Sequence, residues 1–165
     1  MKNAIFFLLA IILVSCNVQK RAVSQAEKLA EAMRAHQYEL TLSYTHPKVI
    51  EMLGGNKKYL EILTTGGKEM KKMGISYESI ALGEPSKPLK AGKELHCLIP
   101  ETITMLLKED KMVSKSHLLA VSKDNGKRWT FIETAVLNEE NIKKILPNYN
   151  PELKIPEQEE PMFIK

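Results

Sequence analysis

The stretch from Ile75 to Leu137 decides the fold, and its clearest part reads Val121-Ser122-Lys123-Asp124-Asn125-Gly126-Lys127-Arg128-Trp129. Asn-Gly between two apolar runs is the strongest short signal for a β-hairpin, because both residues tolerate the positive φ of a tight turn. Apolar and polar residues alternate on both sides of this turn, as they do in a half-buried strand. We therefore expect residues 112–123 and 128–137 to form two antiparallel strands.

Two further strands are expected earlier in the same stretch, at residues 75–82 and about 95–108, separated by a loop at 83–92. The apolar parity changes near Ser79, which predicts a β-bulge. Proline has no N–H to donate, so Pro100 predicts an edge position or a bulge in the long strand. Short turns join all four strands, and the sheet is therefore expected to be an antiparallel meander.

The first half of the chain is helical in pattern. Apolar residues recur at steps of three and four in three segments, at residues 21–37, 47–53 and 57–73. Tyr38 to Tyr44 fits either a short strand or a helical turn. These helices are the only candidates to cover one apolar face of the sheet. The fold class is thus expected to be α+β, with about three N-terminal helices on a curved four-stranded antiparallel sheet.

Several boundary residues refine this expectation. Ser24 and Glu27 have the spacing of a capping box, Pro47 suits the first turn of a helix, and His46 before it is expected to act as a cap or turn residue. Gly66-Gly67 lies on the apolar stripe of residues 57–73. That pair predicts either close approach to the sheet or a break in the helix.

The N-terminus has the pattern of a targeting segment. Lys2 is followed by an apolar run from Ala4 to Val14, too short to span a bilayer, which needs about 20 residues. Leu13-Val14-Ser15-Cys16 resembles the bacterial lipobox. The resemblance implies that residues 1–15 are a signal peptide and that Cys16 is the site of lipid attachment. An ordinary cleaved signal peptide and an uncleaved helical anchor are the alternatives.

The residues after Cys16 bear on localisation. Asn17-Val18-Gln19-Lys20 contains no acidic residue, and by resemblance to known sorting rules this favours the bacterial outer membrane, facing the periplasm. Residues 16–20 are expected to be a short tether. Cys97 is the only other cysteine, so an intramolecular disulfide framework is excluded. Its apolar surroundings in the sequence predict a buried, inert thiol.

The order of these elements resembles the nuclear-transport-factor-2-like superfamily, also called cystatin-like or cone-shaped α+β. The shared features are a capped first helix, a short helix that starts at Pro47 and ends at Gly54-Gly55, a third helix and long curved strands. Tyr44-Thr45-His46-Pro47 is similar to small lipoprotein members of that superfamily. The resemblance spans residues 21–146 and implies a pocket on the concave face of the sheet.

A second resemblance is local. Residues 122–129 are similar to the Asp-box of sialidase propeller blades, with Arg128 where threonine is usual. One copy cannot build a propeller, which needs repeats. We therefore expect a structural turn in which Asp124 accepts backbone hydrogen bonds, Gly126 takes a positive φ and Trp129 packs beneath.

The chain ends in a short predicted helix, residues 138–146, and a Pro/Glu-rich tail, residues 147–165. Acidic residues begin this helix and lysines end it, as the helix dipole favours. The tail has few apolar residues, so it is expected to be extended or disordered. A tail that binds a partner is the alternative.

Composition and motifs narrow the function classes. The chain has 165 residues, 44% of them hydrophobic, and a net charge of +4. The charge is weak and spread along the chain, so we expect no nucleic-acid partner. No phosphate loop, metal-type spacing or nucleophile motif occurs, and no cofactor or metal site is expected. The oligomeric state stays open, and a dimer is compatible with the sequence.

Two acids are the candidate site residues. Glu101 and Glu133 each fall among apolar residues of one strand parity. A carboxyl in an apolar pocket has a raised pKa, which a general acid or base requires. Tyr38 or Tyr44 could add a hydroxyl, and we include Tyr44 with the two acids as the possible pocket. In the alternative, a bulge at Pro100 turns Glu101 outward and Glu133 faces a lysine.

These observations predict an envelope lipoprotein with a non-catalytic module that binds a small apolar ligand or an envelope protein. Two alternatives remain. One is an isomerase- or hydratase-like enzyme, in line with ketosteroid isomerase-like members of the resembled superfamily. The other is an envelope scaffold that acts through its outer sheet face and its acidic tail, with no ligand.

Overall fold

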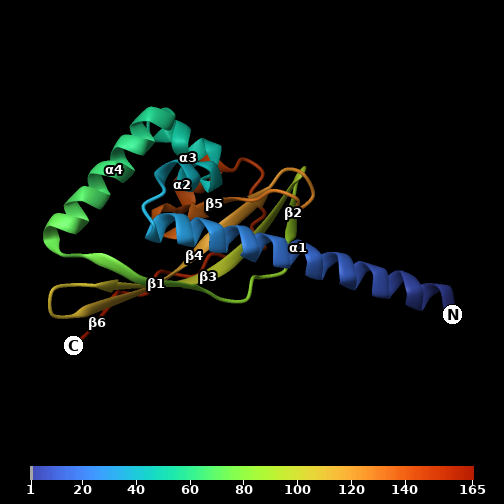
Figure 1. Ribbon diagram of the computed structural model, residues 1–165. Helices are drawn as coiled ribbons and strands as arrows, with labels where there is room; N and C mark the ends of the chain where they lie inside the picture. The colour runs from blue at the N-terminus through green and yellow to red at the C-terminus, as the bar shows by residue number, and fades with distance from the viewer. Residues whose placement is uncertain (1) are drawn as a thin grey trace.

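The computed structural model describes the backbone of residues 2–165 and the side chains of residues 17–138 and 140–165. Five α-helices and a six-stranded antiparallel sheet form an α+β fold, and four of the helices precede the sheet (Figure 1). The fold class is therefore as predicted, with more elements than expected. The helices are α1 (Lys2–Arg34), α2 (Tyr38–Tyr44), α3 (Pro47–Met52), α4 (Gly55–Met73) and α5 (Glu139–Ile145). The strands are β1 (Ser76–Leu82), β2 (Leu89–Ala91), β3 (Glu94–Leu106), β4 (Lys111–Ser122), β5 (Thr130–Glu133) and β6 (Met162–Ile164).

The sheet runs in the order β1-β3-β4-β5, with β2 beside β3 and β6 beside β4. The register shifts between Tyr77 and Ser79, so the predicted bulge is confirmed. Two strands were not predicted, β2 and β6, each three residues long. The last predicted strand is shorter than expected, because the side chain of Glu133 caps a 3₁₀ turn at Thr134–Val136.

Pro100 lies in β3, a strand that is hydrogen-bonded on both sides. It needs no bulge, because its missing N–H falls where β1 has already ended. The carbonyl of Pro100 accepts a hydrogen bond from the N–H of Gly83, one residue past the end of β1. Pro100 therefore occupies a local edge within a central strand, the position that proline tolerates.

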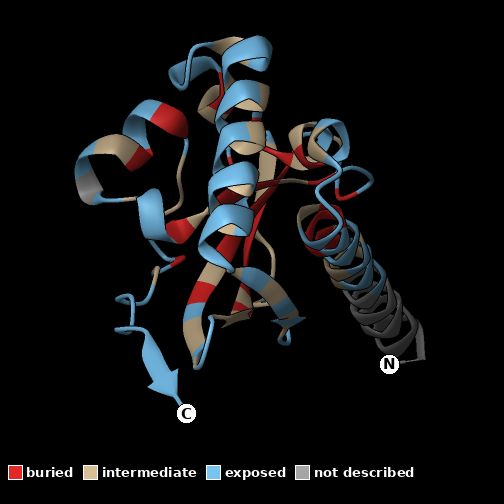
Figure 2. Ribbon diagram, turned by 60° about the vertical axis from the view of Figure 1, so that its left-hand side comes forward, coloured by how far each residue is buried: buried red, intermediate tan, exposed pale blue. Residues whose placement is uncertain are grey.

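The helices differ from the prediction in detail. Tyr38 to Tyr44 is helical, which decides between the two predicted alternatives. α4 continues through Gly66-Gly67 without a break. The close approach at Gly67 is to Tyr38 and not to the sheet, since a Cβ there would overlap the Tyr38 hydroxyl. α4 has no buried residue and packs on α2 and α3 while standing away from the sheet, with mostly exposed residues along its length (Figures 1 and 2).

One face of the sheet is covered by α1. Ala22, Ala26 and Leu29 of this helix pack against the odd-numbered positions of β3 and even-numbered positions of β4. The core on this face comprises Ala22, Ala26, Leu29, Cys97, Ile99, Leu118, Ala120, Trp129 and Phe131. Three small or compact residues on α1 let the helix lie close to the strands, which is how a single helix seals this part of the sheet.

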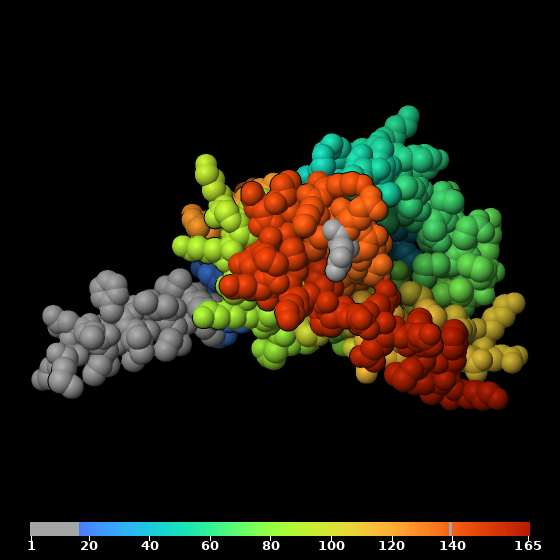
Figure 3. Space-filling view, turned by 180° about the vertical axis from the view of Figure 1, so that it is seen from behind, coloured from blue at the N-terminus to red at the C-terminus, as the bar shows by residue number. Residues whose placement is uncertain are grey.

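The other face is covered by α5 and the chain that follows it. Leu98, Leu119, Val121 and Ile132 point to this side, and they meet Ile142, Ile145, Leu146 and Leu153. Leu153 is buried, and Tyr149 and Ile155 pack beside it, so three side chains of residues 147–155 pack on the core of this face. The tail is therefore not a separate disordered segment. It runs over this face, orange to dark red in Figure 3, and ends in β6.

The hairpin after β4 has the predicted architecture. The carboxylate of Asp124 accepts hydrogen bonds from the N–H groups of Lys127 and Arg128, which lowers the pKa of this carboxyl. Gly126 has a φ of 80°. The indole N–H of Trp129 donates to the carbonyl of Gly126 at 3.2 Å. Trp129 is buried beneath the turn, so the Asp-box-like residues serve as structure here.

The N-terminal segment meets the domain without a flexible connection. Residues 17–20, predicted as a tether, belong to α1, and Val18 packs against the helix-face core. The predicted signal peptide and the lipid attachment at Cys16 lie outside the residues whose side chains are described. Within the described part of the chain, no helix is both long and apolar enough to cross a bilayer.

Candidate functional site

Glu101 and Glu133 lie on the same face of the sheet, the one covered by the helices. Glu101 of β3 pairs with Ser116 of β4, and Glu133 of β5 pairs with Leu118 of β4. Residues two apart along a strand share a face, so both acids point to the side of Ile99 and Phe131. Each acid thus lies among the apolar residues of its own strand, and Glu101 is buried and not turned outward.

The environment of Glu101 favours the protonated carboxylic acid. Only 3% of the residue is exposed. Burial, together with the negative charge of Glu133, raises the pKa of Glu101 to about 8. The Ser116 hydroxyl donates to Oε2 of Glu101 at 3.3 Å and offsets part of this shift. At neutral pH the carboxyl of Glu101 is therefore mostly protonated.

A cavity of about 370 Å³ opens beside Glu133, between the first four helices and β5. Such a volume lies in the range of pockets for small organic ligands. Its wall is mostly apolar and includes Leu29, Met33, Val49, Leu63, Leu118 and Phe131. Glu133 is the only carboxylate among the described residues in this wall, and Glu101 does not line the cavity.

A pair of hydroxyls forms the polar part of the wall. Oγ1 of Thr45 lies 3.1 Å from the hydroxyl oxygen of Tyr59 and 3.0 Å from the carbonyl oxygen of Thr41. The threonine hydroxyl has one proton, and the carbonyl can only accept it. Tyr59 must therefore donate to Thr45, which leaves the phenol oxygen free to accept.

The hydroxyl pair was not predicted, and Tyr44 is not in the wall. The ring of Tyr44 packs instead on Phe131, with centroids 6.4 Å apart. Thr45 and Tyr59 are 14 positions apart; Thr45 caps the end of α2 and Tyr59 lies in α4. No periodic pattern joins such a pair, although Thr45 next to His46-Pro47 lies in the segment that the sequence marks as a boundary. Asn141 of α5 also lines the cavity and was also not predicted.

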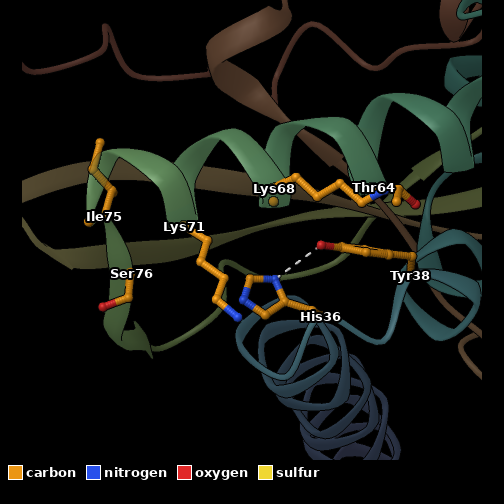
Figure 4. A pocket seen from close by; sticks show the side chains of 9 residues that line it. His36, Tyr38, Thr64, Lys68, Lys71, Ile75 and Ser76 are labelled. Carbon is orange, nitrogen blue, oxygen red and sulfur yellow. Dashed lines mark hydrogen bonds between the residues drawn. The ribbon is translucent and has the colours of Figure 1, made fainter.

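A second hollow lies under α4 and is wider and more basic (Figure 4). Its volume is about 540 Å³, and the residues around it come from the link between α1 and α2, from the start of α2, from α4 and from the start of β1. The Tyr38 hydroxyl lies 3.3 Å from Nδ1 of His36, and Lys71 extends toward the same imidazole. Neither acid reaches this hollow.

Two histidines are buried on the other side of the domain. His46 caps α3, as predicted, by accepting the N–H of Lys48 at its Nδ1, and Nε2 of His96 contacts Glu94 at 3.0 Å. Burial lowers the pKa of both, that of His46 to about 4. Among the described residues, no three histidine, cysteine or acidic side chains lie close enough to hold a metal ion.

Cys97 is fully buried in the helix-face core, as predicted. Burial raises the pKa of this thiol to about 12, so the reactive thiolate is absent at neutral pH. Cys97 is therefore a packing residue.

Comparison of the chain with protein-family models, characterised proteins and solved structures finds no match. The site must therefore be interpreted from its own geometry.

Proposed function

We propose that this chain is a lipid-anchored protein of the bacterial cell envelope whose domain binds a small, mostly apolar ligand. The observation that carries the binding proposal is the mostly apolar cavity of about 370 Å³ with a few polar groups in its wall. A concave apolar site with few polar groups is the usual form of a small-molecule site.

The anchor follows from the lipobox-like Leu13-Val14-Ser15-Cys16. Acylation of Cys16 would hold the domain at a membrane, since each buried methylene contributes about 0.8 kcal/mol. The residues after Cys16 favour the outer membrane and the periplasmic side. Radiolabelled fatty acid should appear on the wild type and not on Cys16→Ala, and an unlabelled wild type contradicts the anchor.

A nuclear-transport-factor-2-like fold is part of the same proposal. In support, helices precede a curved antiparallel sheet, and the cavity lies between the two layers. The extra β2 and β6, and a fourth helix before the sheet, are departures from the predicted pattern.

The wall of the cavity selects the chemistry of the ligand. The free lone pairs of Tyr59 and the carboxylate of Glu133 are hydrogen-bond acceptors. The amide of Asn141 is not free for a ligand, because its Nδ2 donates to the carbonyl of Val136 and its Oδ1 accepts the N–H of Asn138. A buried acceptor is costly to desolvate unless a donor meets it. The preferred ligand is therefore an apolar molecule that carries a hydroxyl or an amine.

The test uses a fluorescent apolar amine, 1-aminoanthracene, and the purified full chain. Leu63→Trp places a large side chain in the cavity wall and should weaken binding at least tenfold. Ile62→Trp is the matched control, because Ile62 is the preceding residue of α4, is exposed and does not line the cavity. Equal losses in both variants, or no binding by the wild type, would contradict the proposal.

The buried acid favours a second candidate, an isomerase-like enzyme. Glu133 would remove a proton from a carbon next to a carbonyl and return it to another carbon of the same ligand, so no co-reactant is needed. Protonated Glu101 would act as a positioning residue that sets the charge of Glu133. Deuterium exchange into bound ketones measures this activity. Exchange by the wild type that is lost in Glu133→Gln, with probe binding kept, supports the enzyme, and no exchange excludes it.

A further inference from the structure

We infer that the end of the domain next to Cys16 is a membrane-docking surface that binds anionic phospholipid headgroups. The inference rests on the proposed anchor at Cys16, and it adds an orientation: the domain lies directly on the bilayer with one defined end. The surface, which we call the basic collar, consists of residues 17–21, 83–93 and 124–128.

Val18 and Gln19, near the start of the described side chains, are held against the domain by direct contacts. Val18 packs so closely against the hairpin turn that a Cβ at Gly126 would lie 2.7 Å from its Cγ1. The amide of Gln19 lies 3.3 Å from the carbonyl oxygens of Pro85 and Ser86. Only Asn17 separates Val18 from Cys16. A lipid on Cys16 would therefore hold this end of the domain directly at the membrane surface, with no flexible linker between them.

The other two collar segments are gathered at the same end of the sheet. Gln25 of α1 binds the hairpin twice, through Nε2 to the carbonyl of Lys127 and through Oε1 to the N–H of Trp129. The turn before β3 lies next to the end of β4, where Leu95 pairs with Ser122. Figure 3 shows the yellow-green residues of this region projecting beside the blue part of α1, far from the dark red end of the chain.

The collar is strongly basic, whereas the rest of the mature chain is not. It contains seven basic and two acidic residues, and the other residues from Cys16 onward contain 16 basic and 18 acidic ones. All seven basic residues are exposed. Among the described side chains, none of the seven pairs with a carboxylate. The positive charge of the domain is thus concentrated at the end that the anchor brings to the membrane.

Charge and position together select the partner. An anionic bilayer attracts basic residues only within about 10 Å of its surface at moderate salt, and each such residue favours the bound state about fivefold. A collar held two residues from an acylated cysteine meets this distance requirement. Basic residues on α4, at the far end of the domain, would lie too far from the membrane surface to meet this requirement.

The test measures contact between a reporter and the lipid headgroups. Full-length lipidated chain is reconstituted into vesicles of phosphatidylcholine alone, or of phosphatidylcholine and phosphatidylglycerol in equal parts, with a nitroxide headgroup quencher. A fluorophore is placed through Glu84→Cys in the collar or through Glu109→Cys in the distant β3–β4 turn, both exposed. Cys97 is buried and stays unlabelled. We expect quenching at position 84 to be several-fold stronger with phosphatidylglycerol and to lose that excess at high salt.

Charge reversal supplies the matched control. The triple variant Lys87→Glu, Lys127→Glu, Arg128→Glu should shift the docked-to-undocked ratio by about a hundredfold or more and abolish the phosphatidylglycerol effect. The triple variant Lys57→Glu, Lys68→Glu, Lys71→Glu on α4 should keep it. Equal quenching in both vesicle types, or equal loss in both triple variants, overturns the inference. The intact mass of the purified chain shows separately whether Cys16 is acylated, so failure of the anchor is told apart from failure of the collar.

Discussion

The same sheet buries titratable groups on two sides of the domain, with opposite results. Glu101, beside Glu133 on the helix side, has a pKa raised to about 8, whereas His46, on the side of His96 and Glu94, has a pKa lowered to about 4. Burial is the first cause in both cases, and in both it favours the uncharged form. What differs is the space next to each pair.

The acids adjoin an apolar cavity of about 370 Å³ through Glu133, whereas His46 borders a smaller and more polar hollow of about 230 Å³. Nε2 of His46 and Nδ1 of His96 are buried without a hydrogen-bond partner among the described residues. His96 stacks on Tyr149 from the C-terminal segment, with ring centroids 6.2 Å apart. A perturbed pKa alone therefore does not mark a binding site in this domain. The acid pair is the better candidate because the cavity beside it is larger and mostly apolar.

The largest expected effect is a difference in stability cost between two neighbouring residues of β4, one on each face of the sheet. Leu119 is fully buried on the closed face, and Leu118 lines the cavity on the other. Leu119→Ala should cost about 2–5 kcal/mol of unfolding free energy, because it opens a void in a filled core. Leu118→Ala should cost clearly less, since part of its surface already faces open space. Urea denaturation measures both, and equal costs would mean that the cavity is filled in solution.

Glu101→Gln tests the acid side. The wild type binds an extra proton when folded, between the ordinary pKa of 4.5 and the raised pKa of about 8. Its stability should therefore fall as the pH rises through this window. The glutamine variant does not have to lose this proton. Its free energy of unfolding should therefore match that of the wild type near pH 4.5 and exceed it by a few kcal/mol above pH 8. Thermal unfolding across this range checks the result.

Glu133 provides the internal control for that experiment. Its negative charge is the second cause of the raised pKa of Glu101, after burial. Glu133→Gln should lower the pKa of Glu101 and narrow the pH window in which stability falls. A stability difference between Glu101→Gln and the wild type that is constant with pH would contradict the assignment.

The sequence predicts this arrangement unevenly, for physical reasons. Strand parity grouped Glu101 and Glu133 each with the apolar residues of its own strand, because alternation records which side chains share a face. The pKa shift of Glu101 depends first on its burial and then on the charge of Glu133 on another strand, and no local pattern encodes either. β2 and β6 escaped prediction because three residues are too few to show an alternation.

The burial of the C-terminal tail and the contact between Thr45 and Tyr59 are likewise not encoded in any local sequence pattern. Leu153 is an isolated apolar residue in a proline-rich segment, and its burial is visible only once the closed face of the sheet is formed. Thr45 and Tyr59 meet because α2 and α4 pack together, not because of their spacing. Contacts between elements, rather than the elements themselves, are what the sequence leaves undetermined.

His46→Asn tests the histidine side. Unfolded His46 binds a proton below about pH 6.5, and the folded form binds it only near pH 4. Wild-type stability should therefore fall as the pH drops from 6.5 to 4, by up to about 3 kcal/mol from this residue. Asparagine can still cap α3 and does not titrate, so the variant should lose this part of the slope. Equal slopes in chemical denaturation at pH 4, 5 and 7 would contradict the assignment.

The smallest expected effect concerns the hydroxyl pair in the cavity wall. Thr45→Val and Tyr59→Phe each remove the bond between Thr45 and Tyr59 while keeping the side-chain shape, and each should cost about 1 kcal/mol. The double variant should cost less than the sum, by a coupling energy of about 0.5–1 kcal/mol. In 1-aminoanthracene binding, Tyr59→Phe should weaken affinity more than Thr45→Val, because only the first removes the acceptor that faces the cavity. Additive stability costs with equal affinities would show that the phenol oxygen points elsewhere, and the cavity would then keep Glu133 as its one acceptor for a ligand's donor.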